Sequence, residues 1–247
     1  MALVTGAGRG IGREIALALA REGCHVALAA RTLAPLEAVA DAARRFGVDA
    51  LPLVLDVSDA AAIEAAVEDA RMKLGLIDVL VNNAGIAESA PFARTDPDLW
   101  DRHLRVNATG PYLLARAVLP AMLERRWGRV INIASLAGLH GAPYVAAYTA
   151  SKHALVGLTR ALAVEVAGKG VTVNAICPGF AATDLTWASA RNIAARTGRS
   201  FEAAVEAMAR LNPGHRLVEP AEVAAVAAKL LHDDTTNGET IVLDGTQ

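Results

Sequence analysis

The sequence predicts an α/β fold of the doubly wound type, in which helices cover both faces of a parallel sheet. Short runs of Val, Ile, Leu and Ala alternate along the chain with longer Ala-rich segments of helical composition. The short runs are apolar at consecutive positions, as expected of strands that are buried on both faces. No linker, charge block or internal repeat divides the chain, so we expect one domain, residues 1–247.

Seven of the short apolar runs are expected to be strands. Strands that are separated by helices run parallel through right-handed crossovers, so these runs should form one seven-stranded parallel sheet. In chain order, the expected strands are Ala2–Thr5, His25–Ala30, Ala50–Leu55, Val79–Asn82, Arg129–Ala134, Val171–Ile176 and Thr240–Leu243.

The longer Ala-rich segments are expected to be the helices that flank this sheet. They are Ile11–Glu22, Ala34–Phe46, Ala60–Lys73, Asp98–Arg125, Tyr144–Ala167 and Ala221–Leu231. A further segment of helical composition, Thr183 to Pro213, contains no strand and interrupts the alternation. Because insertions after the carboxyl end of a strand overhang the binding crevice, we expect residues 183–213 to form a helical substrate lid. A surface insertion without a role in binding is the alternative.

Composition and charge exclude several classes of protein. The chain is 53% hydrophobic and 4% aromatic, and its formal net charge of -2 gives no electrostatic case for binding nucleic acid or an anionic membrane. The first residues lack a signal peptide, and Gly, Pro and polar residues break the uncharged stretches. We therefore expect a soluble cytoplasmic protein. Cys24 and Cys177 are expected to be reduced core residues, and no spacing of ligands predicts a metal site.

A glycine-rich stretch, Thr5-Gly6-Ala7-Gly8-Arg9-Gly10-Ile11-Gly12, follows the first expected strand and opens the first expected helix. Glycines at such a turn let the backbone approach a pyrophosphate, which lies against the positive end of the helix. The strand–turn–helix context raises this pattern above a chance match. The residues expected to bind a dinucleotide here are Gly6, Gly8, Arg9, Gly10, Ile11 and Gly12.

The end of the second expected strand favours NADPH over NADH. An enzyme that uses NAD places an acidic residue there to hold the ribose 2′-hydroxyl, whereas this chain has Arg31. Together with Arg9, Arg31 can form forked hydrogen bonds to a 2′-phosphate. The alternative is that both arginines are solvated loop residues of a protein that uses NADH.

The ends of the third and fourth expected strands are expected to line the adenosine side of the site. Asp56 and Val57 end the third strand, and Asp56 is expected to meet the adenine edge. A helix cap is the alternative for Asp56, although Ser58 or Asp59 is better placed for that role. The fourth strand ends in turn-forming residues, Asn83, Ala84 and Gly85, that tolerate unusual backbone angles.

Three polar residues can together protonate a carbonyl oxygen without a metal. Tyr148 and Lys152 stand four positions apart in an expected helix and therefore share a face. A fixed ammonium beside a phenol favours the phenolate and lowers its pKa, which suits general acid–base catalysis. Ser135, at the end of an expected strand, would hydrogen-bond the reacting oxygen. Taken alone, Tyr148 and Lys152 would be read as a half-buried tyrosine beside a surface lysine.

Taken together, these motifs resemble the short-chain dehydrogenase/reductase family along nearly the whole chain. The motifs occur in order, from Thr-Gly-x-x-x-Gly-Ile-Gly at 5–12 through Asn-Asn-Ala-Gly at 82–85 to Pro178-Gly179. The resemblance implies a Rossmann fold. It also implies a catalytic tetrad of Asn107, Ser135, Tyr148 and Lys152, in which Asn107 perturbs its helix and Lys152 also holds the nicotinamide ribose. Pro178, Gly179 and Thr183 are implied to cover the nicotinamide.

The closer resemblance is to 3-oxoacyl thioester reductases, whose substrates are carried on acyl carrier protein or coenzyme A, and to polyketide ketoreductases. It implies reduction of a ketone to a hydroxyl group. The length of the lid is nearer to that of aromatic polyketide ketoreductases, but the extra glycines that usually follow their Asn-Ala-Gly are missing. The residues expected to face the substrate are Leu136, His140, Phe180 and Trp187. Alternatives are an NAD-dependent hydroxyacyl or alcohol dehydrogenase and a non-catalytic cofactor-binding sensor.

Two kinds of macromolecular contact are implied by the resemblance. A basic cluster, Arg125, Arg126, Arg129 and Lys169, is expected beside the cleft as a docking site for acyl carrier protein, with a solvated charge cluster as the alternative. Relatives are commonly tetramers or dimers that pair their long fourth and fifth helices and their last strand. A homotetramer is therefore expected to assemble through Asp98–Arg125 and Tyr144–Ala167, with a dimer as the alternative.

Overall fold

The computed structural model covers the whole chain, Met1–Gln247, and contains one parallel sheet of seven strands. The strand order is β3-β2-β1-β4-β5-β6-β7, which confirms the predicted doubly wound fold. The strands are β1 (Ala2–Thr5), β2 (Val26–Ala30), β3 (Ala50–Val54), β4 (Val79–Asn82), β5 (Gly128–Ile133), β6 (Val171–Pro178) and β7 (Thr240–Leu243).

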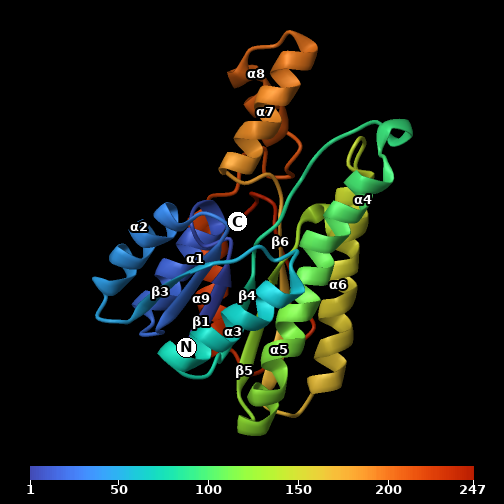
Figure 1. Cartoon of the computed structure of the whole chain (residues 1–247). Helices are drawn as coiled ribbons and strands as arrows, with labels where there is room; N and C mark the ends of the chain where they lie inside the picture. Colours follow the sequence, from blue (N-terminus) through green and yellow to red (C-terminus); the bar gives the residue numbers. More distant parts are fainter.

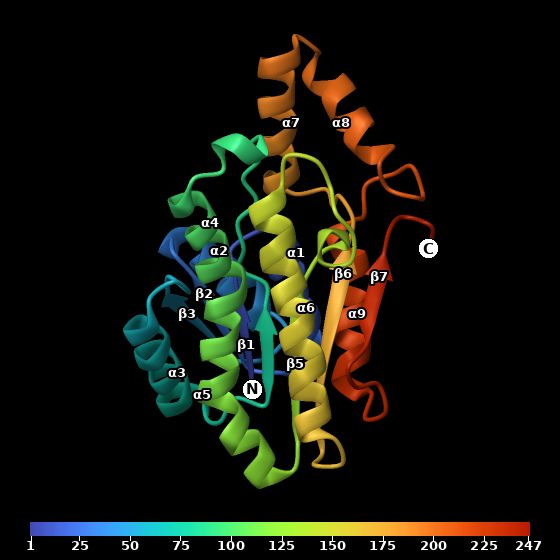
Figure 2. The same cartoon turned by 90° about the vertical axis from the view of Figure 1, so that its right-hand side faces the viewer.

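Helices cover both faces of this sheet (Figures 1 and 2). One face carries α1 (Gly10–Arg21), α2 (Leu33–Arg44) and α9 (Pro220–His232). The other face carries α3 (Ala60–Leu74), α5 (Gly110–Arg125) and α6 (Ala146–Val166). Aliphatic side chains of the sheet pack against each layer and form a separate buried cluster on each side. No helix is both long and apolar enough to cross a membrane.

The chain reverses its direction of winding between β1 and β4. β1 pairs with β2 on one side and with β4 on the other, so the crevice at the carboxyl ends of these two strands lies at the switch point of the sheet. Ligands of doubly wound proteins bind at this position. The glycine-rich turn follows β1 directly, and the segment that begins at Asn83 follows β4.

The predicted insertion forms a helical hairpin that projects beyond the carboxyl edge of the sheet (Figures 1 and 2). Its helices are α7 (Asp184–Thr197) and α8 (Phe201–Ala209). Ala190, Ala204 and Met208 are buried between them and form a small core that is separate from the two large ones. We call residues 183–213 the lid; its action on a substrate stays a prediction.

Two predicted helices differ from the observed ones. The segment Asp98–Arg125 is not one regular α-helix, because a π-helical turn, Arg105–Thr109, lies between α4 (Pro97–Leu104) and α5. The helix expected from Tyr144 begins only at Ala146, since Tyr144 has a φ of 67°, outside the helical region.

Candidate active site

The predicted catalytic residues come together at the carboxyl end of β5. Ser135 follows that strand, while Tyr148 and Lys152 lie one turn apart on α6. The ammonium nitrogen of Lys152 lies 5.8 Å from the centre of the Tyr148 ring and donates a hydrogen bond to the Ile133 carbonyl at 2.8 Å. Tyr148 is half-buried and Lys152 is 5% exposed. Lys152 is therefore a buried residue, whereas the alternative interpretation made it a surface lysine.

The pKa of the Tyr148 phenol differs from the prediction in its direction. Burial is the largest influence and raises the pKa above its ordinary value of 10.0, whereas hydrogen bonding with Ser135 lowers it. A buried phenolate lacks hydration, and this cost outweighs the help from the serine hydroxyl. Lys152 was expected to lower the tyrosine pKa below its ordinary value, and that expectation is wrong for the protein alone.

Burial acts on Lys152 in the opposite sense. It lowers the pKa of the ammonium from 10.5 to about 8, because a charged group that is removed from water is destabilised. The Ile133 carbonyl supplies one acceptor for this ammonium. Lys152 is therefore a proton donor that titrates much closer to neutral pH than an exposed lysine does.

Asn107 lies at the centre of the π-helical turn and is fully buried. Its amide nitrogen donates to the Ile86 carbonyl and to the Ser151 hydroxyl, both at 2.9 Å, and its oxygen accepts from the Ile86 N–H at 2.9 Å. A Cβ atom on Gly85 would lie 3.2 Å from the Asn107 oxygen and 3.7 Å from the Lys152 nitrogen. The irregular turn thus aims Asn107 at the segment after β4 and at α6, next to Lys152.

The glycine-rich turn has the close backbone approaches that a pyrophosphate cradle requires. A Cβ atom on Gly12 would lie 2.3 Å from the Gly6 carbonyl oxygen, so only glycine fits there. Gly6 and Gly10 have φ values of 65° and 54°, a region that L side chains rarely adopt. With the first N–H groups of α1 beside it, this turn fits the phosphates of a dinucleotide.

Thr5 and Asn83 hold the glycine-rich turn against the end of β4. The Thr5 hydroxyl donates to the Val81 carbonyl at 3.2 Å and accepts from the N–H groups of Asn83 and Ala84, at 3.0 and 3.1 Å. The Asn83 amide donates to the carbonyls of Thr5 and Gly6, at 2.9 and 3.3 Å. Sequence reasoning missed this role of Thr5, although a polar residue that ends a buried strand is the signal that would have found it.

A chain of buried amides behind the site was also missed. Asn82 donates to Asn132 at 2.8 Å, and Asn132 donates to the Thr159 hydroxyl at 2.8 Å. All three side chains are at most 2% exposed, and they join β4, β5 and α6. These bonds fix the helix that carries Tyr148 to the strands beneath it.

The two arginines expected to read the 2′-phosphate are exposed, but only Arg9 makes an ion pair. Arg9 pairs with Asp184, the first residue of α7, at 3.2 Å. Arg31 lies near Asp56, whose pKa is lowered by hydrogen bonds from the Ser58 N–H and hydroxyl and, to a smaller extent, by the charge of Arg31. The cap of α3 is Asp59, so Asp56 does not have the capping role that was its alternative interpretation.

The remaining residues predicted to bind the dinucleotide lie around the same crevice. Val57 is buried, and its carbonyl oxygen would lie 2.6 Å from a Cβ atom on Gly110, where α5 begins. Ile11 lies in the first turn of α1 and packs against the core. A Cβ atom on Gly10 would lie 3.3 Å from the Thr183 side chain, so the start of the lid lies against the glycine-rich turn.

The base of the lid is closed by one buried asparagine. Asn212 is 1% exposed and accepts from the Phe180 N–H at 2.9 Å. It donates to the carbonyls of Phe180 and Arg216, at 2.9 and 2.6 Å, so it joins the two ends of the lid. Gly179 follows Pro178 at the end of β6, and a Cβ atom on it would lie 2.3 Å from the Asn212 oxygen.

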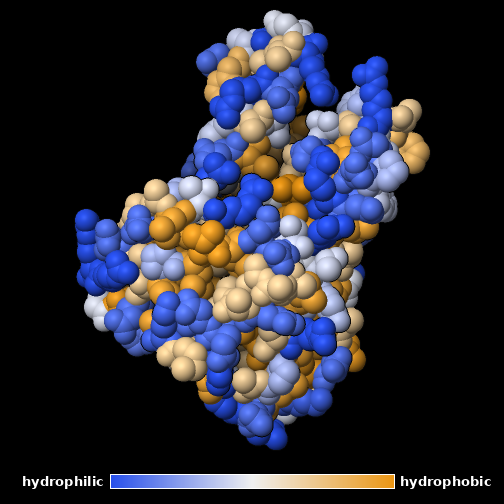
Figure 3. Space-filling model, viewed as in Figure 1, coloured by the Kyte–Doolittle hydropathy of each residue, from blue (hydrophilic) through white to orange (hydrophobic).

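The four residues expected to face the substrate do not form one cluster. Leu136 follows Ser135 directly, and His140 lies exposed in the same loop. Phe180, at the base of the lid, is 37% exposed. Trp187 packs against Phe201 inside the lid, with ring centres 6.2 Å apart. Figure 3 shows apolar side chains in the hollow between the lid and the region of α4.

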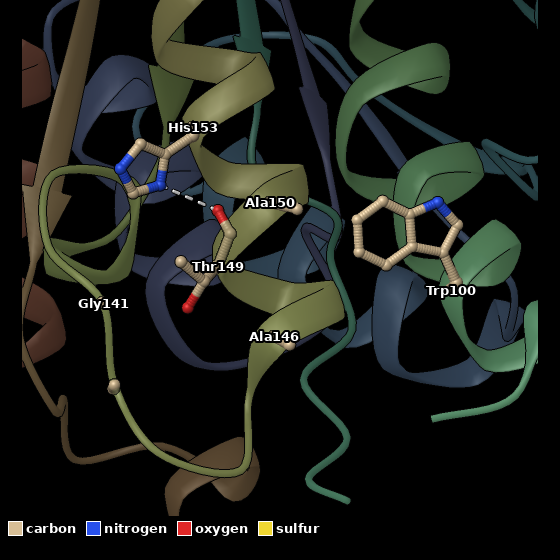
Figure 4. Close-up of a pocket in the computed structure, with 7 residues that line it drawn as sticks. Trp100, Gly141, Ala146, Thr149, Ala150 and His153 are labelled. Carbon is tan, nitrogen blue, oxygen red and sulfur yellow. Dashed lines mark hydrogen bonds between the residues drawn. The ribbon is translucent and has the colours of Figure 1, made fainter. Parts of the chain in front are cut away.

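A cavity of about 460 Å³ lies on a neighbouring face of α6 and contains none of the predicted catalytic residues. Figure 4 shows Trp100 on one side and Thr149 and His153 of α6 on the other. It lies next to the tetrad in sequence, but it is a groove between α4, α6 and the loop at Gly141.

The basic cluster lies at the amino ends of the strands and therefore does not border the cleft of its own chain. Arg125 pairs at 2.9 Å with Asp78, which precedes β4, and Arg126 donates to the Gly168 carbonyl, which precedes β6. Arg129 is 1% exposed and contacts the Trp127 ring. Lys169 is exposed in the turn after α6. These positions are at the amino ends of the strands, opposite to Ser135, which corrects the predicted placement.

The cysteines and acidic residues give no sign of a metal centre. Cys24 and Cys177 are free thiols, as predicted, and burial raises the pKa of both. No three His, Cys, Asp or Glu side chains gather into a set that would hold a metal ion.

Comparison with known proteins gives the same family as these motifs. The sequence pattern of the family described as short chain dehydrogenase matches residues 1–194. A putative ketoacyl reductase of Streptomyces coelicolor is 40% identical over 233 residues, which cover 94% of this chain and 89% of that protein. The 3-oxoacyl-(acyl-carrier-protein) reductase FabG of Pseudomonas aeruginosa is 39% identical over 247 residues, covering 99% and 96%.

Solved structures agree in fold over nearly the whole chain. A variant of actinorhodin polyketide ketoreductase with NADPH superposes with a TM-score of 0.94 at 38% identity, covering 99% of this chain and 95% of the other. Levodione reductase gives a TM-score of 0.93 at 35% identity with the same coverage. The matched pattern, the shared fold and the high identity lead to one conclusion: this chain belongs to the short-chain dehydrogenase family.

Proposed function

We propose that this protein reduces the ketone of a 3-oxoacyl thioester, or of a related secondary ketone, to a hydroxyl group with NADPH. The observation that carries the proposal is the approach of a buried ammonium, Lys152, to the ring of Tyr148 beside Ser135, at the crevice that begins with the glycine-rich turn. This arrangement supplies a proton to an oxygen and a cradle for a dinucleotide in one crevice.

In the proposed reaction, the substrate oxygen accepts hydrogen bonds from the Tyr148 and Ser135 hydroxyls. When bound, NADPH would supply the hydride to the carbonyl carbon, and Tyr148 would give its phenolic proton to the oxygen. The C=O π bond, the donor C–H bond of the cofactor and the O–H bond of Tyr148 would break, while one C–H and one O–H bond form on the substrate, so that NADPH is oxidised to NADP⁺ and the ketone is reduced. The positive charge of Lys152 favours the phenolate that remains. Asn107 keeps the segment after β4 in place beside Lys152.

Arg9 and Arg31 are the residues that we propose hold the 2′-phosphate. Both are exposed guanidinium groups near the end of β2 or the start of α1, and no ion pair engages Arg31. No carboxylate lies at the position where one would hold a ribose 2′-hydroxyl. The relative that was solved with NADPH supports this choice of cofactor.

The names of the relatives support the substrate class. A ketoacyl reductase and a reductase of acyl-carrier-protein thioesters are each about 40% identical along nearly the whole chain. Leu136, directly after Ser135, and the partly exposed Phe180 at the base of the lid present apolar surface, which suits an acyl group better than a sugar. The basic cluster lies at the opposite end of the sheet, so it does not border this crevice as a docking site for a carrier protein.

The experiment that tests this function is reduction of acetoacetyl-coenzyme A with NADPH or NADH by the wild type and by Tyr148→Phe. We expect the substitution to lower kcat by about 10³-fold and to leave NADPH binding intact, because it removes only the acidic hydroxyl. Tyr144→Phe is the matched control: this tyrosine is exposed, and its side chain makes no hydrogen bond.

The possible results separate the alternatives. Exclusive use of NADH would contradict the assignment of Arg9 and Arg31. A wild type that binds NADPH but reduces no ketone would indicate a cofactor-binding sensor. Faster oxidation of a hydroxyacyl substrate with NAD would favour a dehydrogenase.

A cyclic ketone is a second candidate substrate. The match to levodione reductase covers 99% of this chain, and the name of that protein denotes a reductase of a ketone. Cyclohexanone, tested beside acetoacetyl-coenzyme A, distinguishes the two classes by the ratio of their kcat/KM values.

We also propose that the protein assembles as a homotetramer through the outer surfaces of α5 and α6. A shallow groove there is lined by small and apolar side chains, among them Ala108, Tyr112, Ala154 and Leu158. Tyr112 is 47% exposed and lies in this groove beside Leu158, so the two side chains form apolar surface that a partner subunit would cover in the proposed assembly. Sedimentation velocity of the wild type and of Tyr112→Glu tests the assembly; a monomeric wild type would contradict it.

A further inference from the structure

His103 of α4 is the most deeply buried titratable side chain beside the proposed active site that the proposed reaction does not use. It has no exposed surface, and both of its ring nitrogens are engaged. Nδ1 lies 2.8 Å from the Leu99 carbonyl oxygen, one turn earlier in the helix. Nε2 accepts a hydrogen bond from the Glu88 N–H at 3.0 Å.

These two contacts fix the protonation state of the imidazole. An amide N–H can only donate, so Nε2 carries a lone pair, and a carbonyl can only accept, so Nδ1 carries the proton. His103 is therefore neutral in this arrangement. A second proton on Nε2 would face the Glu88 N–H and break the contact.

The segment that His103 holds is the one that leaves β4 and passes the catalytic residues. Asn107, one turn after His103, holds the N–H and the carbonyl of Ile86. His103 holds Glu88, and the Ala90 N–H donates to the Tyr144 carbonyl at 2.8 Å. The segment is thus held at alternate residues: Ile86 and Glu88 by the side chains of Asn107 and His103, and Ala90 by the loop before α6.

The same imidazole also touches the proposed proton donor. The rings of His103 and Tyr148 lie 6.4 Å apart between centres, at an interplanar angle of 75°, which is an edge-to-face contact. One side chain therefore contacts both the segment after β4 and the catalytic ring.

We propose that His103 is a positioning residue of the active site: as a neutral Nδ1–H imidazole, it fixes the Glu88 backbone and the ring of Tyr148 in one arrangement. This inference rests on the proposed function, because it matters to turnover only where Tyr148 donates the proton. Displacement of a catalytic group by about 1 Å can lower the rate of a reaction by about 100-fold.

A purely structural histidine would also be buried and hydrogen-bonded, so the test must separate the bond to Glu88 from the filling of space. His103→Gln can place its amide oxygen near the position of Nε2 and keep the acceptor for Glu88. His103→Asn reaches only the position of Nδ1 and keeps the Leu99 contact alone. His103→Leu fills the space and keeps neither bond.

We expect kcat with acetoacetyl-coenzyme A and NADPH to fall by about tenfold or more in His103→Leu and His103→Asn, with rescue in His103→Gln. The dissociation constant for NADPH should stay the same, because the glycine-rich turn does not contact His103. Amide hydrogen exchange at Glu88 should accelerate in the Leu and Asn variants and not in the Gln variant.

His25→Asn is the matched control. The His25 ring also accepts a backbone N–H, that of Asp49 at 2.9 Å, but it lies at the amino end of β2, away from the site. It should leave kcat unchanged.

Equal kcat in the Asn and Gln variants would overturn the inference, since the acceptor for Glu88 would then have no effect. Unchanged exchange at Glu88 in His103→Asn would overturn it as well. If His103→Leu does not fold, the Asn and Gln pair still decides. Wild-type turnover in Tyr148→Phe would instead refute the proposed function, and it would do so whatever the His103 variants show.

Discussion

The segment after β4 and the lid lie on either side of the same crevice, yet they are held in different ways. Buried side chains hold the segment after β4 through hydrogen bonds. Asn107 and His103 have no exposed surface, and each makes polar contacts with two or more groups. The lid has a small core of its own and an exposed ion pair, Arg9 with Asp184, whose side chains are 74% and 57% exposed. Asn212, at its base, is a polar side chain that is both buried and hydrogen-bonded.

From this difference we expect the segment after β4 to be the more rigid side of the crevice and the lid to be the more mobile side. Hydrogen bonds of buried groups are costly to break, because the group left unpaired stays away from water. Exposed ion pairs contribute about 0–1 kcal/mol and exchange readily for water or for another charged partner. Tyr148 and Lys152, the proposed proton-transfer residues, therefore lie on the side with the buried hydrogen bonds, whereas we expect the lid to be the side that moves, about its base at Asn212.

The largest effect, on turnover, is expected from Lys152→Met, which removes the buried ammonium beside Tyr148. Turnover should fall by about 10³-fold, because the phenolate loses its positive neighbour. Stability should rise at pH 7, since a folded-state pKa of about 8 in place of 10.5 corresponds to about 3 kcal/mol of burial cost, which loss of the Ile133 hydrogen bond offsets in part.

The lowered pKa of Lys152 also predicts how stability depends on pH. Between about pH 8 and 10.5 the unfolded wild type binds more protons than the folded protein, so its stability rises with pH in that window. The advantage of Lys152→Met should therefore shrink as pH rises from 8 towards 10.5. Urea unfolding at pH 7 and pH 9.5 measures this; an advantage that is equal at both values would contradict the assignment.

Asn107→Leu should lower the free energy of unfolding by about 3 kcal/mol, a smaller effect than that of Lys152→Met on turnover. The substitution leaves the N–H and the carbonyl of Ile86 without their partners at the start of the held segment. Urea unfolding with acetoacetyl-coenzyme A assays in parallel measures both effects. Asn237→Leu is a useful comparison, since its amide also bridges two backbone groups, but at the amino end of β6. Its turnover should be unchanged.

Asn212→Ala tests the base of the lid and should cost about 2 kcal/mol locally. Because the lid has a core of its own, hydrogen exchange should accelerate in α7 and α8 while the amides of β1, β4 and β5 keep their protection. Acceleration across the whole sheet would mean that the lid and the sheet unfold as one unit.

The smallest effect is expected from Asp184→Asn, which removes the ion pair between the lid and the glycine-rich turn. Stability should change by less than about 1 kcal/mol, because both side chains are exposed. The affinity for NADPH should rise a few-fold and that for NADH should not, since Arg9 is freed to meet a 2′-phosphate. Fluorescence titration with both dinucleotides measures the ratio, and an equal change for both would refute the competition.

Much of this architecture could be read from the residues in order. The seven strands lie within a few residues of their predicted limits, because runs apolar on both faces are compatible only with a covered parallel sheet. Gly6, Gly10 and Gly12 were identified from their place between a strand and a helix, and each meets a backbone or steric demand there. The tetrad was predicted from its spacing and from family resemblance, and its catalytic role stays a prediction.

The errors arise where the surroundings of a residue decide its behaviour. The Tyr148 pKa was predicted to fall, but burial raises it, and burial is a property of the packed protein. The basic cluster was placed beside the cleft because the family resemblance implied it, although the length of β5 separates the cluster from Ser135. His103 was overlooked, since nothing in its neighbours along the chain reveals a bond to Glu88.

The sequence by itself determined the doubly wound fold, the glycine cradle and the identity of the groups that can move a proton. Each of these follows from local periodicity, backbone freedom or side-chain chemistry, which neighbouring residues fix. Tertiary structure alone decided that Lys152 is buried, that His103 is neutral, and that Arg9 meets Asp184, 175 positions away. Solvation and charge pairing depend on residues that only folding brings together, so no pattern along the chain encodes them.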